Sequence, residues 1–232
     1  MIMKGLILSL LALSASAKLG ADFGPDWANN FQPSDLQCLK STGLKFLIIR
    51  SWQKYGAMDV HAMESLRNAN AAGFDFVDTY LFPCRTMDAR TQVRQLVGNL
   101  TQGGAKYGRI WLDIELNPWP GCGFDNFTAE SNCQFVADLV DELRAQKQDL
   151  GIYSSHWEWV QIFGNDTYCS NFTDVPLWYA HFDGVKSFSD YSKATFGGWK
   201  TPIIKQYIDL TRNTVCGLTI DQDYIPDADE ET

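Results

Sequence analysis

Short apolar runs alternate with longer segments of helical periodicity over the first two thirds of the chain. The apolar runs predict strands, and the periodic segments predict helices that cover them. In the segment Thr128–Gln146, Phe135, Leu139 and Leu143 fall on one helical face. The predicted strands are Leu19–Phe23, Leu44–Ser51, Phe74–Leu81, Arg109–Glu115 and Leu150–Ser154, and the predicted helices are Ser34–Thr42, Asp59–Ala72, Asp88–Leu100, Thr128–Gln146 and His156–Phe163.

The alternation stops in the last third of the chain. Pro176–Phe182, Pro202–Tyr207 and Leu218–Asp221 look like strands, joined by loops rich in Gly, Ser and Asp. Repeated β-α units indicate a mainly parallel sheet. Eight strands with five helices therefore predict an α/β fold, an irregular TIM-like (β/α)5(β)3 barrel, as a single domain over residues 18–226 with an acidic tail at 227–232.

The N-terminus has the layout of a cleavable secretory signal over residues 1–17, with Lys4 before an apolar stretch and Ala15-Ser16-Ala17 at its end. This stretch is too short to cross a bilayer, which takes about 20 residues. We expect a mature chain that starts near Lys18, has no membrane span, and is secreted or resides in the lumen of an acidic endolysosomal or phagosomal compartment.

Six cysteines, without the paired short spacing of zinc sites, fit an oxidising compartment and predict three disulfides. Cys122 and Cys133 flank a short acidic loop and are the first expected pair. For the other four, sequence order gives Cys38–Cys84 and Cys169–Cys216 as the default. Four sequons predict exposed glycosylation acceptors at Asn99, Asn126, Asn165 and Asn171.

The charge balance narrows the range of ligands. The formal net charge of −9 becomes −10 without Lys4, which disfavours nucleic acid and anionic lipid by long-range repulsion. The three histidines, His61, His156 and His181, are too few and too spread to suggest a metal site. We therefore expect no metal and no cofactor.

In a TIM-like barrel, functional side chains gather where the strands end. The predicted strand ends are unusually acidic and aromatic. They carry Asp22, Asp78, Tyr80, Asp113, Glu115, Tyr153, Trp178, Gln206, Tyr207 and Asp221.

The sharpest pattern is Trp111-Leu112-Asp113-Ile114-Glu115. Strand geometry puts Asp113 and Glu115 on one face, about 6 to 7 Å apart along the backbone. Glycoside hydrolysis requires two carboxyl groups about one bond, and like charges at this range raise one pKa and so supply an acid. Glu115, at the strand end, is the better candidate for the acid, and Asp113 for the second carboxylate.

These residues resemble a known family. Gly20-Ala21-Asp22, the Asp-x-Glu pair, Gly151-Ile152-Tyr153, Leu177-Trp178-Tyr179-Ala180, Lys205-Gln206-Tyr207 and Ile220-Asp221 occur in the order found in the Chalaropsis-type lysozymes, glycoside hydrolase family 25. The resemblance covers essentially the whole mature chain, and the cysteines and sequons fit a eukaryotic, secreted branch. At the end of the sixth predicted strand, His181 and Phe182 stand where the family commonly has Asn and an aromatic residue.

The resemblance implies a lysozyme that cleaves the β-1,4 bond between N-acetylmuramic acid and N-acetylglucosamine in bacterial peptidoglycan, acting as a monomer. By position, Glu115 matches the general acid. Asp113 matches the second carboxylate, as nucleophile or as the group that steers the substrate's acetamido group. Asp22 and Asp221 match flanking acidic residues, and the positions that would hold the sugar are Tyr80, Tyr153, Trp178 and Gln206.

Two other functions stay open at this point. One is a glycan-binding protein without catalysis on the same barrel, although binding alone does not require an acid with a shifted pKa. The other is a hydrolase of another N-acetylated glycan such as chitin, whose acetamido-sensing site would look alike. Comparing the cleavage of a chitin oligomer with the cleavage of a cell-wall preparation distinguishes the two substrates.

Overall fold

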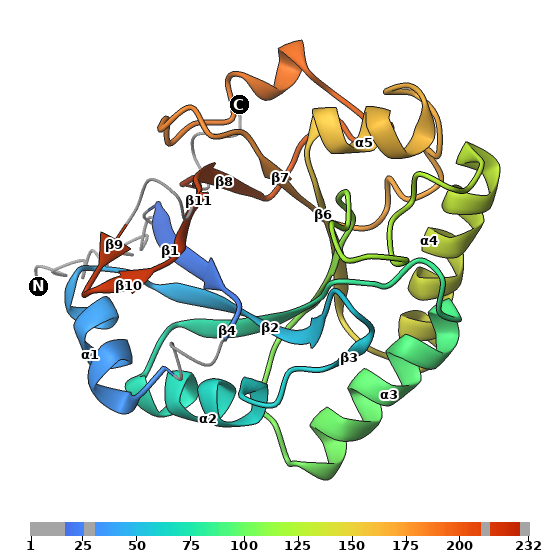
Figure 1. The fold of residues 1–232 in the computed structure, drawn as a ribbon. Coiled ribbons are helices and arrows are strands. Elements are labelled where there is room, and N and C mark those ends of the chain that lie inside the picture. Colours follow the sequence, from blue (N-terminus) through green and yellow to red (C-terminus); the bar gives the residue numbers. More distant parts are fainter. Residues whose placement is uncertain (1–16, 26–30, 210–213, 228–232) are drawn as a thin grey trace, which may run out of the picture.

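A closed barrel forms the centre of the protein in the computed structural model, which describes residues 17–25, 31–209 and 214–227 (Figure 1). Its strands, in ring order, are β1 (Lys18–Phe23), β2 (Phe46–Gln53), β4 (Phe76–Leu81), β5 (Ile110–Asp113), β6 (Leu150–Ser154), β7 (Leu177–Ala180), β8 (Ile204–Ile208) and β11 (Asp221–Ile225). The ring closes because β1 pairs with β2 on one side and with β11 on the other. A short strand, β3 (Ala57–Met58), pairs with β2 outside the ring.

Five helices follow the first strands and lie around the outside of the barrel (Figure 1). They are α1 (Pro33–Ser41), α2 (Ala62–Ala72), α3 (Ala89–Gln102), α4 (Ala129–Ala145) and α5 (His156–Phe163), and a single 3-10 turn, η1, lies at Tyr191–Lys193. The side chains of Asp88, Thr128 and Ser155 accept hydrogen bonds from the first turns of α3, α4 and α5, which sets where these helices begin. The predicted (β/α)5(β)3 barrel is confirmed.

Alternate side chains of each strand point to opposite faces of the barrel wall, and this produces two hydrophobic cores. On β5, Leu112 packs outward among the residues between the barrel and the helices, whereas Trp111 points into the barrel. Inside, Trp111 is packed with Phe46, Ile48 and Trp178. The barrel is therefore filled below its mouth, which lies at the carboxyl ends of the parallel strands.

The prediction of the eighth strand was wrong. Leu218–Thr219 forms β10, which pairs with β9 (Thr214–Val215) in a separate hairpin. The barrel strand is β11, and it runs antiparallel to both of its neighbours, β1 and β8. Asp221 therefore begins the last strand instead of ending it, and the reversed direction still brings it to the mouth beside Asp22.

The predicted disulfide pairing was also wrong. The bonds are Cys38–Cys216, Cys84–Cys122 and Cys133–Cys169. Each bond joins segments that the barrel brings together: α1 to the β9–β10 turn, the segments after β4 and β5, and α4 to the segment after α5. Proximity in sequence, which suggested Cys122–Cys133, fails because α4 carries Cys133 away from the loop.

Most of the predicted signal segment, residues 1–16, and residues 228–232 of the acidic tail lie outside the described residues. None of the described helices has the length and apolar character needed to cross a membrane. The four sequon asparagines, Asn99, Asn126, Asn165 and Asn171, are all exposed, as an acceptor site requires.

Candidate active site

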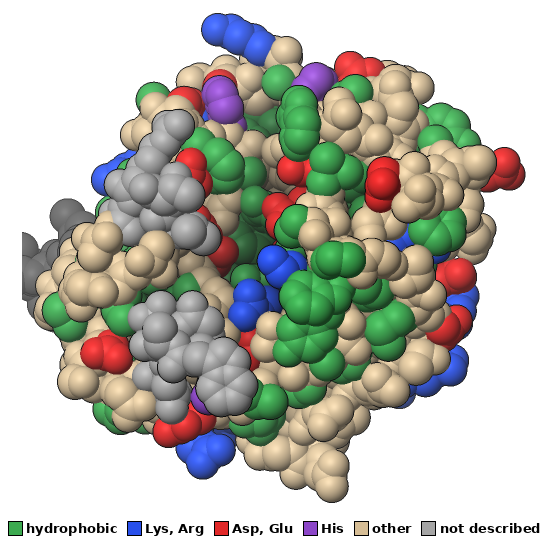
Figure 2. Space-filling model, viewed as in Figure 1, with side chains coloured by type: hydrophobic (Ala, Val, Ile, Leu, Met, Phe, Trp, Pro, Cys, Tyr) green, Lys and Arg blue, Asp and Glu red, His purple; other side chains and the backbone are tan. Residues whose placement is uncertain are grey.

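A cavity of about 390 Å³ opens at the barrel mouth. Figure 2 shows it as a hollow with acidic and basic side chains on its walls. The structure brings together here all eight residues expected to act on or bind a substrate: Asp22, Tyr80, Asp113, Glu115, Tyr153, Trp178, Gln206 and Asp221. The remaining lining residues are Arg50, Lys54, Phe82, Phe182 and Asp209. Asp209 directly follows β8, so the same rule could have found it, whereas Arg50 lies inside β2.

Two of the predicted strand-end residues lie elsewhere. Asp78 is one layer below the mouth, where it accepts hydrogen bonds from the indole of Trp111 at 2.9 Å and from the Arg109 amide. Tyr207 points out of the barrel, and its hydroxyl donates to Gln222. Both follow from the period of two along a strand, which moves alternate side chains to opposite faces and successive inward ones to different depths.

The aromatic floor of the cavity is fixed by polar contacts. Trp178 packs against Trp111 edge to face, with ring centroids 5.6 Å apart. Its indole nitrogen donates to Asp223 Oδ1 at 2.9 Å, which ties the floor to β11. Asp223 is buried and was not singled out from the sequence, because its strand was misplaced there.

Three side chains from three strands form a hydrogen-bonded chain. The Tyr153 hydroxyl donates to Gln206 Oε1 at 2.6 Å, and Gln206 Nε2 donates to Asp22 Oδ1 at 2.7 Å. Burial, followed by the charges of Asp221 and Asp223, raises the pKa of Asp22 well above its usual range, although the Gln206 bond opposes the shift. These two hydrogen bonds fix the positions of Tyr153, Gln206 and Asp22 relative to one another at the cavity.

The carboxyl groups of Asp113 and Glu115 differ in depth. Asp113 is the buried last residue of β5, while Glu115 lies in a bend just beyond the strand and is partly exposed. Burial, then the charges of Glu158 and Asp221, raises the pKa of Glu115 to about 8. Burial, then the charges of Glu115 and Glu158, raises the pKa of Asp113 well above its usual range. The pair therefore resists double ionisation and holds a proton near neutral pH.

Two cations moderate this acidic site. The Arg50 guanidinium is held by Asp59, with Nη2 donating to Oδ2 at 2.9 Å, and its charge lowers the pKa of Asp113. Lys54 lowers the pKa of Glu115, but burial and two neighbouring acids outweigh it. The guanidinium thus opposes the rise in the pKa of Asp113 without reversing it, so the pKa values of both carboxyl groups stay raised.

Glu158 is a further acidic group that sequence reasoning missed. It lies in the first turn of α5, and its Oε2 accepts a hydrogen bond of 2.7 Å from the amide of Leu116, the residue after Glu115. No strand ends at Glu158, so nothing in the sequence pattern connects it with the cavity. It joins α5 to the segment that carries Glu115.

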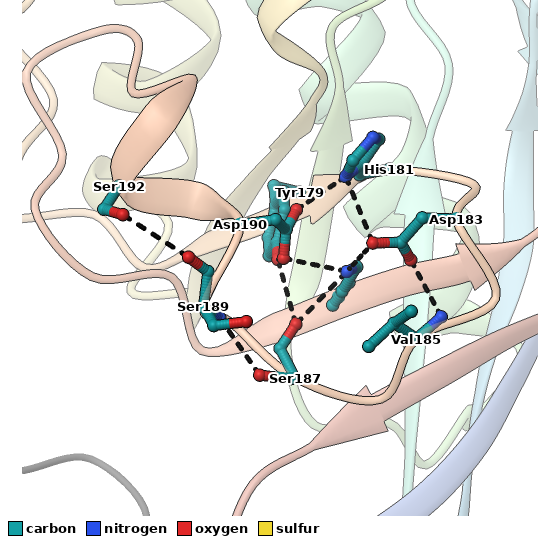
Figure 3. Close-up of polar contacts among 9 residues, drawn as sticks. Tyr179, His181, Asp183, Val185, Ser187, Ser189, Asp190 and Ser192 are labelled. Carbon is teal, nitrogen blue, oxygen red and sulfur yellow. Dashed lines mark hydrogen bonds and ion pairs between the residues drawn. The ribbon is translucent and has the colours of Figure 1, made fainter.

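A second polar cluster lies beside the mouth, and we call it the loop cluster. His181, Asp183 and Asp190 come from the loop after β7 (Figure 3), and Lys205 comes from β8. The imidazole of His181 and the carboxylates of Asp183 and Asp190 are close enough together to hold a metal ion. However, Lys205 Nζ donates hydrogen bonds to Asp183 and Asp190 at 2.9 Å each. Burial alone would raise the pKa of Asp190, yet its bonds from Lys205, His181 and Tyr179 hold that pKa below its usual value. The ammonium supplies the positive charge that these carboxylates need.

Comparison with known proteins places this chain in a family. The sequence model of the family described as lysozyme-like protein 1 matches residues 17–207. "Probable GH family 25 lysozyme 4" of Dictyostelium discoideum is 37% identical over 222 residues, covering 95% of this chain and 97% of its own length. The chain belongs to the glycoside hydrolase family 25 lysozymes. "Lysozyme-like protein 5" of Caenorhabditis elegans is 35% identical over 227 residues, covering 97% of this chain and 100% of its own length.

Solved structures agree with the fold of this lysozyme. A family GH25 lysozyme from Aspergillus fumigatus superposes with a TM-score of 0.69 at 23% identity, over 90% of this chain and 94% of its own. The bacterial lysozyme from Streptomyces coelicolor gives a TM-score of 0.71 at 20% identity, over 90% and 92%. The resemblance expected from the sequence is confirmed, and the protein is a glycoside hydrolase.

Proposed function

We propose that this lysozyme hydrolyses the β-1,4 bond between N-acetylmuramic acid and N-acetylglucosamine in bacterial peptidoglycan, with Glu115 as general acid and Asp113 as second carboxylate. The observation that carries the proposal is the pair itself: two buried or half-buried carboxyl groups at one cavity, with the pKa of Glu115 raised to about 8. Such a group is protonated at the pH where a general acid has to act.

The reaction follows from this arrangement. Glu115 donates its proton to the glycosidic oxygen as the C1–O bond breaks, and the positive charge that develops at C1 is stabilised by ionised Asp113. Asp113 Oδ1 is buried without a hydrogen-bond partner among the described residues, so it is available either to C1 or to the acetamido group of the substrate. Water then adds its hydroxyl to C1 and returns a proton to Glu115.

The remaining side chains would hold the sugar. The rings of Tyr80, Tyr153 and Trp178 offer apolar surfaces to a pyranose, and Gln206 offers an amide to its polar groups. Asp22 and Asp221 would complete the hydrogen bonding and set the charge of the site. Three disulfides support a setting outside the cytosol, and we propose a secreted or lumenal enzyme that acts as a monomer.

The test is release of reducing ends from purified peptidoglycan across acid to neutral pH, with mass analysis of the products. Wild type should release muropeptides that end in reducing N-acetylmuramic acid. Glu115→Gln should fold normally and lose at least about 1000-fold in rate, and Asp113→Asn should fall by orders of magnitude. Wild-type-like lysis by folded Glu115→Gln would refute the assignment of the acid.

Two further outcomes separate the other functions. If the wild type binds peptidoglycan but releases no reducing ends at any pH, the protein is a glycan-binding module. If it cuts chitin oligomers and leaves the cell-wall preparation intact, the substrate is a different N-acetylated glycan. Either result overturns the proposed bond.

A further inference from the structure

A second cavity, of about 450 Å³, lies between the start of α5 and the loop after β7. It is lined in part by Trp157, Phe182 and Tyr191, with His156 and His181 among its polar residues. None of these five residues is needed for the hydrolytic step proposed above.

The second cavity adjoins the catalytic one. Phe182 lines both of them. Glu158 also lines the second cavity, while its carboxylate accepts the hydrogen bond from Leu116 beside Glu115. A polymer that leaves the catalytic cavity past Phe182 would therefore enter the second one.

Two aromatic side chains at this cavity face solvent. Trp157 is 59% exposed and Phe182 is 42% exposed, among the most exposed large hydrophobic side chains of the described residues. On the same helix, Trp159 is fully buried, so α5 is anchored by one tryptophan while it presents the other. Exposed aromatic faces beside an active site are typical of surfaces that bind the apolar face of a sugar.

The wall opposite α5 is held in place by the loop cluster. Lys205 is completely buried, and its ammonium also donates to the carbonyl of Ser187 at 3.1 Å (Figure 3). His181 Nδ1 lies 2.6 Å from Asp190 Oδ2, and the Tyr179 hydroxyl donates to Asp190 Oδ1 at 2.9 Å. These contacts preform the cavity before a ligand arrives, which lowers the ordering cost of binding.

We propose that the second cavity binds a further N-acetylated sugar unit of the glycan strand, beyond the two units that flank the bond being cut. Trp157 and Phe182 would stack on the pyranose, and the polar groups of His181 and Asp190 would meet its hydroxyl and acetamido groups. This placement rests on the proposed function, because it takes the strand to run through the catalytic cavity.

Charge favours a sugar over the peptide stem of peptidoglycan. Glu158 and Asp190 contribute carboxylates to the cavity, and the chain as a whole has a formal net charge of −9. A stem peptide with free carboxylates would be repelled, whereas the uncharged N-acetylglucosamine units of the strand would not. Apolar rings together with hydrogen-bonding groups also match the two faces of a pyranose.

The test compares Trp157→Ala with Tyr168→Ala, a control that removes an aromatic side chain of 39% exposure outside both cavities. The substrates are peptidoglycan oligosaccharides of increasing length, freed of stem peptides. Trp157→Ala should reduce the preference for long over short substrates about three- to tenfold, mainly through KM, which matches the loss of one stacking contact. Tyr168→Ala should keep the wild-type preference.

Calorimetry with the same oligosaccharides in a Glu115→Gln background separates this inference from the proposed function. If wild type cleaves nothing but Trp157→Ala still weakens binding of the longer oligosaccharides, the catalytic assignment fails and the second site stands. An unchanged length preference and unchanged affinity in folded Trp157→Ala overturn the second site. Competition by free stem peptide that depends on Trp157 would assign the cavity to peptide instead.

Discussion

Glu158 links the segment that carries Glu115 to helix α5 through its hydrogen bond from the Leu116 amide, and its charge also acts on Glu115. After burial, this charge is the largest cause that raises the pKa of Glu115 to about 8. Asp221 adds to the shift and Lys54 opposes it. If Glu115 is the acid, the alkaline limb of the pH profile reports this pKa, because activity is lost as Glu115 ionises.

We expect Glu158→Gln to move the alkaline limb of kcat/KM to lower pH, with activity at pH 8.5 reduced about two- to tenfold. Glutamine retains an oxygen that can accept the Leu116 hydrogen bond, so the change removes charge and leaves the contact. Glu130→Gln, an exposed acid in the first turn of α4, is the matched control. An alkaline limb that stays in place in Glu158→Gln would contradict this role.

The sequence was most informative about single residues at the ends of the parallel strands. Strand alternation was enough to single out Asp113, Tyr80 and Gln206, all of which line the cavity. It could not find Glu158, which reaches the site from a helix through tertiary packing, or Asp223, which depends on where an antiparallel strand begins. These positions are set by contacts between distant segments and leave no periodic pattern.

The loop between β7 and β8 shows how one element is stabilised where the barrel has no helix. Lys205 lies in β8, and alternation turns it outward while its neighbour Gln206 faces the mouth. The loop covers it completely, so its ammonium is compensated by Asp183 and Asp190. A buried charge held in this way becomes costly as soon as one partner is removed.

Lys205→Met should therefore destabilise the protein by about 3 to 5 kcal/mol, because Asp183 and Asp190 lose their counter-cation. The measurement is the free energy of unfolding in urea. Lys193→Met, at an exposed lysine of the same loop, should change it by less than about 0.5 kcal/mol. Equal effects of the two substitutions would show that the ion cluster contributes no special stability.

Element boundaries were predictable where local chemistry marks them. The predicted starts of α3, α4 and α5 lie within one residue of the observed ones, where the side chains of Asp88, Thr128 and Ser155 cap the helices. The eighth strand was misassigned because its first residue is a buried aspartate, and because Leu218–Thr219, just before it, belongs to another hairpin. Because β11 buries two aspartates, Asp221 and Asp223, its sequence lacks the apolar run by which the other strands were predicted.

The disulfides connect segments that lie far apart in the sequence, and so they constrain the whole molecule. Cys38–Cys216 spans 178 residues and links the first helix to the hairpin before the last strand, whereas Cys133–Cys169 spans 36 residues. The sequence correctly indicated three bonds but could not indicate their partners, because pairing follows the closure of the barrel.

Replacing Cys38 and Cys216 together by serine should cost about 5 kcal/mol of stability, against about 4 kcal/mol for Cys133 and Cys169, because the longer loop restricts the unfolded chain more. Thermal unfolding of the two double variants, without reductant, provides the comparison. A larger loss for the Cys133–Cys169 variant would mean that native packing around that bond outweighs the chain entropy.

The antiparallel last strand also decides where the two ends of the barrel domain emerge. Lys18, at the start of β1, pairs with Ile225, at the end of β11, while Asp22 and Asp221 pair at the mouth. Lys18 and Ile225 therefore lie at the end of the barrel away from the mouth. A bead, a surface or a fused carrier attached at either end would tether the enzyme with its open face outward, free to meet an insoluble substrate as large as a cell wall.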